Sequence, residues 1–215
     1  MEEAGLLPLD RWALLELKGW VRRVSAAYDQ YDFTRVFHET DSFCAVTLSA
    51  RYFDILKDRL YTTAKDSPER RSAQTVLLQI LQALAVGIAP ILSFTAEEVW
   101  QAMPEAFRKE KSVFLALWPV VEPEPSEGVL REMDDWNRLF DVKEDVSKAL
   151  EGLRKDKVIG SSLQAEVDLF VEGESLLKLL QSHASDLPTL FLVSQVHAMA
   201  GSPSSDATRG EKTPG

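Results

Sequence analysis

Six polar and aromatic side chains between residues 57 and 71 have the types and spacing needed to bind an anionic partner. The candidate binding residues are Lys57, Asp58, Arg59, Tyr61, Arg70 and Arg71. Lys57 and Tyr61 are four residues apart, so a helix would place them on one face, with Asp58 beside them. Basic side chains bind phosphate oxygens, an exposed tyrosine ring can stack on an unpaired base, and a carboxylate can accept a hydrogen bond from a base amino group.

The charge of this stretch is opposite to that of the whole chain. The sequence has 24 Lys and Arg residues against 34 Asp and Glu residues, a formal net charge of -10. Within residues 51–71, however, six basic side chains outnumber four acidic ones. Because a strongly acidic chain opposes non-specific binding to nucleic acid, any such contact must use a local patch, and we expect no DNA partner.

A purely structural interpretation of the same residues is also open. Asp58 and Arg59 could close an ion pair between helices, and Arg70 and Arg71 could simply be solvated. Lys57 and Tyr61 could equally lie at the edge of a packed helix. The sequence alone does not separate these roles.

No catalytic, metal or cofactor site is predicted. The sequence has no glycine-rich phosphate loop followed by Lys and Ser or Thr. His38, His183 and His197 are far apart and lack the spacing of metal ligands. The single cysteine, Cys44, excludes an internal disulfide and a multi-cysteine metal centre.

We expect the elements that carry the candidate residues to form a helical bundle over residues 1–118. A helix over 10–28 is expected, with Asp10 as its N-cap, then a helix from about Phe33 buried on more than one side. A further helix capped by Ser49 would carry Lys57 to Tyr61. Ser67 and Pro68 read as the N-cap and first residue of the next helix, and a capping-box pattern begins another at Thr95. Short connections favour antiparallel neighbours.

The second half of the chain has a different character. Residues 119–128 are rich in Pro and Glu and are expected to form a linker. Residues 129–200 read as a small α+β domain: a charged helix over 130–157, then strands at 163–171 and 190–198 separated by a helix. The tail, 201–215, is expected to be disordered. No apolar run approaches the roughly 18 residues of a membrane span, and no signal peptide is visible, which fits a cytoplasmic protein.

Two segments carry a resemblance to a known family. "YDFTRVFHETDSFCAVTLSARYFDILKDRLYT" and "SPERRSAQTVLLQILQALAVGIAPILSFTAEEVWQAMP" closely resemble the helical anticodon-binding domain of bacterial-type isoleucyl-tRNA synthetases, and "VIGSSLQAEVDLFV" resembles the start of their C-terminal appendix. "KDRLY" with "APILSFTAEEVW" favours the isoleucyl family over its valyl and leucyl relatives. The resemblance extends over about residues 8 to 200.

The resemblance implies a mainly α fold, a helical bundle followed by a small α+β appendix, that binds the anticodon stem and loop of an isoleucine tRNA. The parent enzyme would use ATP and Mg²⁺ to join isoleucine to this tRNA. The HIGH-type and KMSKS motifs, the editing domain and the first helix of the family's bundle do not occur in this sequence, so we expect a catalytically inactive fragment. We also expect the chain to be a monomer. Whether the full protein carries a zinc module after residue 215 stays open. Two alternatives also remain: a scaffold domain that docks onto proteins, and a valyl- or leucyl-type domain.

Overall fold

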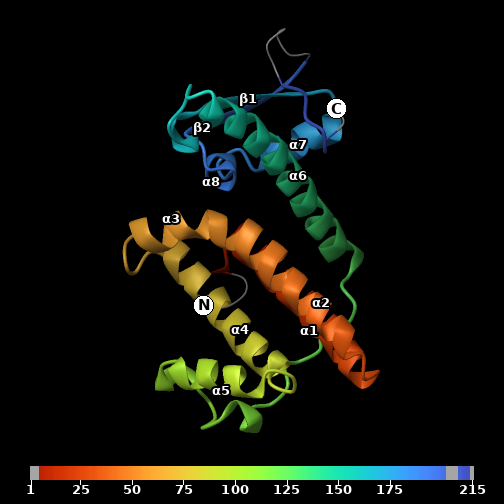
Figure 1. Ribbon diagram of the computed structural model, residues 1–215. Coiled ribbons are helices and arrows are strands. Elements are labelled where there is room, and N and C mark those ends of the chain that lie inside the picture. Colours follow the sequence, from red (N-terminus) through yellow and green to blue (C-terminus); the bar gives the residue numbers. More distant parts are fainter. Residues whose placement is uncertain (1–4, 202–207, 214–215) are drawn as a thin grey trace. The chain divides into compact units, whose positions relative to one another are not determined.

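The computed structural model describes residues 5–201 and 208–213. The chain divides into two compact units, Met1–Glu124 and Pro125–Gly215. The first is entirely helical, and the second contains three helices and a two-stranded sheet among its described residues (Figure 1). The expected mainly α bundle with a small α+β appendix is confirmed.

The first unit is built from a long helical hairpin and a second pair of helices. The elements in chain order are α1 (Pro8–Asp29), α2 (Phe33–Ser42), the π-helical segment η2 (Phe43–Phe53), α3 (Asp54–Thr62), α4 (Pro68–Ile88), α5 (Ser93–Ala102) and the short 3-10 turns η3 (Glu105–Phe107) and η4 (Val113–Leu115). Helix α1 packs against α2, η2 and α4. The core between them includes the fully buried Trp12 and the Trp20 ring stacked on Phe43, with ring centroids 5.5 Å apart.

Three predicted helix starts differ from the structure. Helix α1 begins at Pro8, because proline suits the first helical position, and Asp10 therefore lies inside the first turn instead of capping it. No helix starts at Ser49, since α2, η2 and α3 run on without a breaking residue. Helix α5 begins at Ser93, before the capping-box pattern at Thr95.

The burial of α2 was also predicted wrongly, whereas the start of α4 is confirmed. Only Val36 of α2 is buried, and Phe33 and Phe37 are 51% and 62% exposed. At α4, the Ser67 hydroxyl accepts a hydrogen bond from the Arg70 N–H, and Pro68 is the first helical residue. Capping at this point fixes where the chain turns from α3 into α4.

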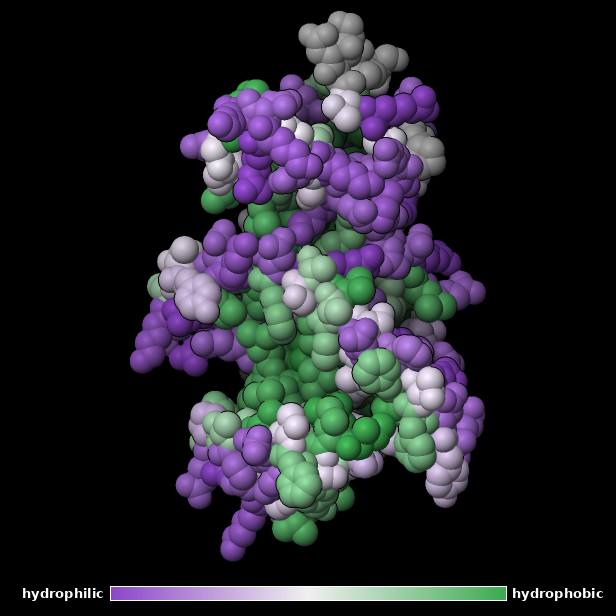
Figure 2. All heavy atoms as spheres, in the orientation of Figure 1, coloured by the Kyte–Doolittle hydropathy of each residue, from purple (hydrophilic) through white to green (hydrophobic). Residues whose placement is uncertain are grey.

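The end of the first unit around α5 has an apolar surface. Hydrophobic residues gather over this end in Figure 2. Phe94 is 88% exposed and Leu117 is 90% exposed, and Tyr28 packs edge-on against Trp118 with ring centroids 5.4 Å apart. This end offers apolar contact area, in contrast to the charged connection between α3 and α4.

The second unit is a βαβ arrangement beside a long helix. Its elements are α6 (Glu127–Lys155), the 3-10 turn η5 (Ser162–Gln164), β1 (Glu166–Val171), α7 (Glu174–Ser182), α8 (Leu187–Phe191) and β2 (Gln195–Ala200). The two strands pair in parallel, with Glu166 opposite Gln195. The second strand starts later than the predicted 190–198, because Leu187–Phe191 forms the short helix α8, which has Pro188 among its first residues.

Part of the C-terminal tail, residues 201–215, is held by hydrogen bonds, whereas the composition predicts disorder. Residues 211–213, in the part of the sequence whose composition predicts a disordered tail, form hydrogen bonds with Asp145 of α6. Positions 202–207 and 214–215 of that tail lie outside the described residues.

Candidate nucleic-acid interface

All six predicted binding residues lie in one continuous piece of the first unit, the α3–α4 corner (residues 54–71). Helix α3 contributes Lys57, Asp58, Arg59 and Tyr61, and the first turn of α4 contributes Arg70 and Arg71. The turn of residues 63–67 joins the two helices, so the side chains are brought together by local sequence.

Hydrogen bonds from side chains to the backbone close the corner. The Thr62 and Thr63 hydroxyls donate to the carbonyl oxygens of Asp58 and Arg59, each at 2.6 Å. The Arg70 guanidinium donates to the Thr63 carbonyl at 3.4 Å. Only the last four carbonyl groups of a helix lack intrahelical partners, so the bonds to Arg59 and Thr63 supply donors where the end of α3 leaves carbonyl groups open, and the bond to Asp58 adds a second donor.

Four of the six candidates are exposed on this corner. Tyr61 is 85% exposed, and Asp58 is exposed beside it. Lys57 pairs with Asp54 at 3.1 Å and Arg71 pairs with Asp66 at 2.7 Å, and both cations are 54% exposed. Exposed ion pairs of this kind contribute about 0–1 kcal/mol, so either cation could exchange its carboxylate for a phosphate at small cost.

Arg59 is placed differently, because its guanidinium is directed into the bundle. It pairs with Asp10 of α1 at 2.7 Å, and the two side chains are 11% and 0% exposed. The same carboxylate accepts hydrogen bonds from the hydroxyl of Tyr52 at 2.7 Å and from that of Ser72. The partner of Arg59 is thus Asp10, not the neighbouring Asp58 considered from the sequence.

This buried network joins four elements of the first unit. Asp10 belongs to α1, Tyr52 to η2, Arg59 to α3 and Ser72 to α4. Burial and the adjacent Asp10 charge raise the pKa of Tyr52 well above its usual range, so its phenol stays protonated and donates to the carboxylate. The network holds α3 in place, and α3 in turn presents Lys57 and Tyr61.

Arg70 is intermediate between these two situations. Its guanidinium reaches back over the turn to Thr63, and its Nε is buried without a hydrogen-bond partner among the residues that the structure describes. One edge of this side chain is therefore occupied by the fold. Glu69 lies beside it in the first turn of α4, and a backbone hydrogen bond and the Ser67 hydroxyl lower the pKa of its carboxyl.

Sequence reasoning missed the residues that support the corner, Asp10 above all. The available signal was an aspartate surrounded by Leu9, Trp12 and Leu14, on the stripe of α1 that faces the core. A carboxylate on a buried face requires a donor from another element. The position of that donor, Arg59, depends on how the helices cross, which periodicity does not reveal.

Other kinds of site find no support among residues 5–201 and 208–213. No group of three or more His, Cys, Asp or Glu side chains in this part of the chain is placed to hold a metal ion. No helix described there combines the length and apolar character required to cross a membrane.

Comparison with known proteins gives the chain a context. Residues 10–169 match the family described as "Anticodon-binding domain of tRNA ligase". The chain is 49% identical over 188 residues to isoleucine–tRNA ligase of Geobacter sulfurreducens, which covers 87% of this chain and 20% of the relative. The ligase of Kosmotoga olearia is 44% identical over 192 residues, and that of Desulforamulus reducens is 43% identical over 206; these matches cover 89% and 95% of this chain. The chain spans about a fifth of the length of the relatives it matches.

Proposed function

Because the chain belongs to the family of anticodon-binding domains of tRNA ligases, we propose that it binds the anticodon stem and loop of an isoleucine tRNA. The family match over residues 10–169 carries this proposal, since it includes the whole α3–α4 corner. The isoleucine specificity rests on the relatives, which are isoleucine–tRNA ligases. In the same proposal the chain is part of a cytoplasmic ligase that consumes ATP with Mg²⁺ elsewhere in the protein, and the chain itself is a monomer.

The exposed side chains of the corner have complementary roles in this proposal. Lys57 and Arg71 bind phosphates of the stem, and the exposed ring of Tyr61 stacks on an unpaired loop base. Asp58 accepts a hydrogen bond from the amino group of a base. Arg70 contributes charge at the phosphates through the edge of its guanidinium that does not face Thr63.

Arg59 has an indirect role. Its buried pair with Asp10 holds α3 so that Lys57 and Tyr61 face the RNA together. We therefore expect Arg59 to border the RNA only through the helix that it anchors.

Titration with an isoleucine tRNA transcript at a series of salt concentrations tests the proposal. Each phosphate contact contributes about -0.7 to -0.9 to the slope of log affinity against log salt. Lys57→Ala and Arg71→Ala should each weaken binding and make this slope shallower by about 1. Tyr61→Ala should cost about 1–3 kcal/mol with little change of slope, because stacking carries no charge.

Arg154→Ala supplies the matched control. Arg154 forms an exposed ion pair with Glu151 on α6 at 3.3 Å, and its side chain is 53% exposed, nearly the same as Arg71. Equal effects of Arg71→Ala and Arg154→Ala would contradict the assignment of the corner. A valine tRNA transcript measures whether the chain discriminates between tRNAs.

The alternative function is a scaffold domain that binds proteins through its acidic surface. The formal net charge of -10 is the observation that favours it. Absence of tRNA binding over the whole salt series would favour the scaffold over the RNA-binding module.

A further inference from the structure

The C-terminal strap (residues 209–213) contacts α6 mainly through hydrogen bonds to one carboxylate, that of Asp145. Asp145 Oδ1 accepts hydrogen bonds from the backbone N–H groups of Glu211 at 3.1 Å and Lys212 at 3.2 Å. Asp145 Oδ2 accepts from the N–H of Lys212 at 3.1 Å and from that of Thr213 at 3.2 Å, and also from the Thr213 hydroxyl at 2.9 Å. Three consecutive amide groups thus converge on one side chain, an arrangement typical of anion binding by backbone N–H groups.

The strap can approach Asp145 this closely because residue 210 is glycine. A Cβ atom at Gly210 would lie 2.7 Å from Asp145 Oδ2 and 3.1 Å from Thr213 Oγ1. The first distance is shorter than real Cβ contacts, so a Cβ atom at this position would force the carboxylate or the strap to shift and would disturb the contact between them. The contact therefore selects a glycine one residue before the first bonded amide.

Charged side chains on both sides of Asp145 add to this selection. Lys148 of α6 pairs with Glu211 at 3.1 Å, and Glu144 of α6 pairs with Lys212. Burial opposes the charge on Asp145, yet the hydrogen bonds from the strap outweigh burial and lower the pKa of its carboxyl. Helix α6 thus presents Glu144 to Lys212, Asp145 to the backbone amides and Lys148 to Glu211, so each charged group of the strap meets one of opposite sign.

We propose that this face of α6, formed by Glu144, Asp145 and Lys148, is a peptide-docking site for an extended segment of the type Gly-Glu-Lys-Thr, occupied here in cis by residues 210–213. The ligand class is defined by the contacts: a glycine that permits close approach, three consecutive free amide groups, and an acidic and a basic side chain in that order. Docking depends mainly on the backbone, so the site takes a chain segment and not an isolated amino acid.

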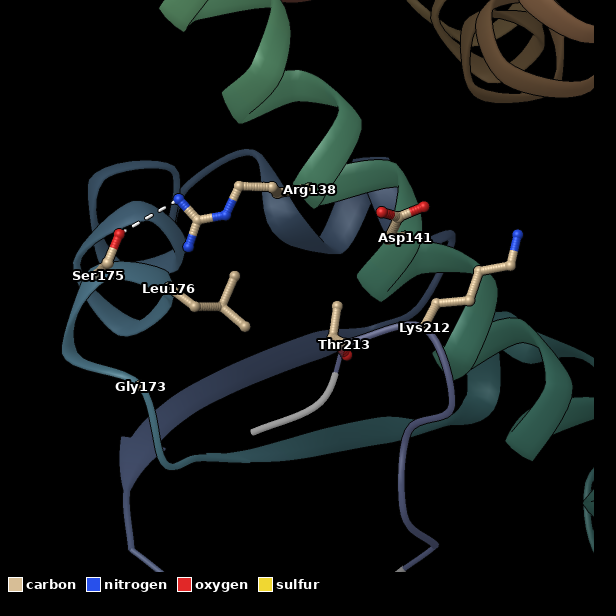
Figure 3. A pocket seen from close by; sticks show the side chains of 7 residues that line it. All are labelled: Arg138, Asp141, Gly173, Ser175, Leu176, Lys212 and Thr213. Atoms are coloured by element: carbon tan, nitrogen blue, oxygen red, sulfur yellow. Dashed lines mark hydrogen bonds between the residues drawn. The ribbon is translucent and has the colours of Figure 1, made fainter.

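The docked strap also completes a pocket of about 350 Å³ in the second unit. Arg138 and Asp141 of α6, Gly173, Ser175 and Leu176 at the start of α7, and Lys212 and Thr213 of the strap lie around it (Figure 3). Release of the strap would remove the wall formed by Lys212 and Thr213. Docking in cis therefore supplies one wall of this pocket.

Amide hydrogen exchange of the intact chain tests the docking. The amides of Glu211, Lys212 and Thr213 should exchange at least about tenfold more slowly than those of an unstructured peptide of the same sequence. Gly210→Ala and Asp145→Asn should each abolish this protection while the exchange of the α6 core stays unchanged. Gly152→Ala is the control for the first, because a Cβ there meets no atom within 4 Å. Asp134→Asn, which neutralises an exposed acid of the same helix, is the control for the second.

Binding in trans provides an independent readout. In the Gly210→Ala variant the emptied site should bind the peptide acetyl-Arg-Gly-Glu-Lys-Thr-amide, seen as chemical-shift changes at Glu144, Asp145 and Lys148. A dissociation constant of about 0.1 mM or lower is expected, because tenfold protection in cis requires the effective concentration of a short tether, about 1 mM, to exceed the dissociation constant about tenfold. The same peptide with alanine in place of glycine should not bind. Unprotected strap amides in the natural chain, or equal binding of the two peptides, would overturn the proposal.

Discussion

Replacing Asp10 by alanine tests how far the first unit depends on one buried carboxylate. Asp10 is fully buried and accepts hydrogen bonds from Tyr52, Arg59 and Ser72. Its removal leaves the Arg59 guanidinium, only 11% exposed, without its counter-ion. Since water has little access there, the variant should bear the cost of an uncompensated buried charge.

The magnitude follows from the burial of both partners. Removing one member of a buried ion pair typically costs about 3–5 kcal/mol. With a urea dependence of about 2 kcal/mol per molar, the unfolding midpoint of the first unit should fall by about 1.5–2.5 M. Tryptophan fluorescence reports mainly on this unit, because Trp12, Trp20, Trp100 and Trp118 belong to it and Trp136 alone belongs to the second.

Two further variants separate the ion pair from general damage to the core. Arg71→Ala removes an exposed cation from the same corner and should change the stability by at most about 1 kcal/mol. The double variant Asp10→Ala with Arg59→Met removes both charges, so it should be more stable than Asp10→Ala alone. If Asp10→Ala were no more destabilising than Arg71→Ala, the network would not be what holds α3 against α1 and α4.

Two other predictions concern neighbouring parts of the first unit. The pKa of Tyr52 is raised in the folded state, so the stability that its neutral phenol contributes is present below about pH 10 and falls above it by about 1.4 kcal/mol per pH unit. Between pH 9 and pH 11, the free energy of urea unfolding should therefore fall less in Tyr52→Phe than in the unchanged chain. A fall due to Tyr28 should remain in the variant, because burial raises the pKa of that tyrosine too. Gly87→Ala should destabilise the unit by about 1–3 kcal/mol, because a Cβ there would lie 2.5 Å from the Trp20 ring, whereas Gly152→Ala in the open part of α6 should stabilise its helix by about 0.5–1 kcal/mol, as thermal unfolding can measure. A loss of stability in Gly152→Ala as large as that in Gly87→Ala would rule out the close approach of α1 and α4 as the cause.

The candidate corner could be located from the sequence because its signals are local. The Ser67–Pro68 pair marks the start of α4, and the position of Tyr61 one helical turn after Lys57 places both side chains on one face of α3. Each of these features depends on residues a few positions apart. The fold class followed in the same way, from helical periodicity and from two short alternating segments that pair as parallel strands.

The role of Arg59 could not be obtained in this way, because its partner is 49 residues distant. The sequence places Asp58 beside Arg59, yet on a helix adjacent side chains diverge. The sequence predicts Asp10 as a helix cap because aspartate is common there, but the helix starts at Pro8 and Asp10 is a buried residue of its first turn. Tertiary packing thus decided the function of both charges.

The same distinction explains the strap. By composition, the tail "GSPSSDATRGEKTPG" lacks any large apolar side chain and is predicted to be disordered, since burial of apolar surface is the usual source of order. The order of residues 210–213 comes instead from backbone amide groups that converge on Asp145. A hydropathy pattern describes side chains and not backbone N–H groups, so it could not predict this contact with α6.

The basic α3–α4 corner attracts RNA, whereas the acidic remainder of the chain repels it. At 0.15 M salt, charges farther apart than about 8 Å are largely screened, so the cations of the α3–α4 corner act on a phosphate in contact while most of the -10 formal charge does not. At about 0.01 M salt the screening length approaches 30 Å, and the acidic remainder of the chain then repels the same RNA. A local basic patch on an acidic chain therefore discriminates best between RNA that fits the patch and other RNA at moderate salt, where only groups in direct contact contribute to binding. Exposed cations such as Lys57 and Arg71 suit that condition, because their present carboxylate partners are easily exchanged for phosphate.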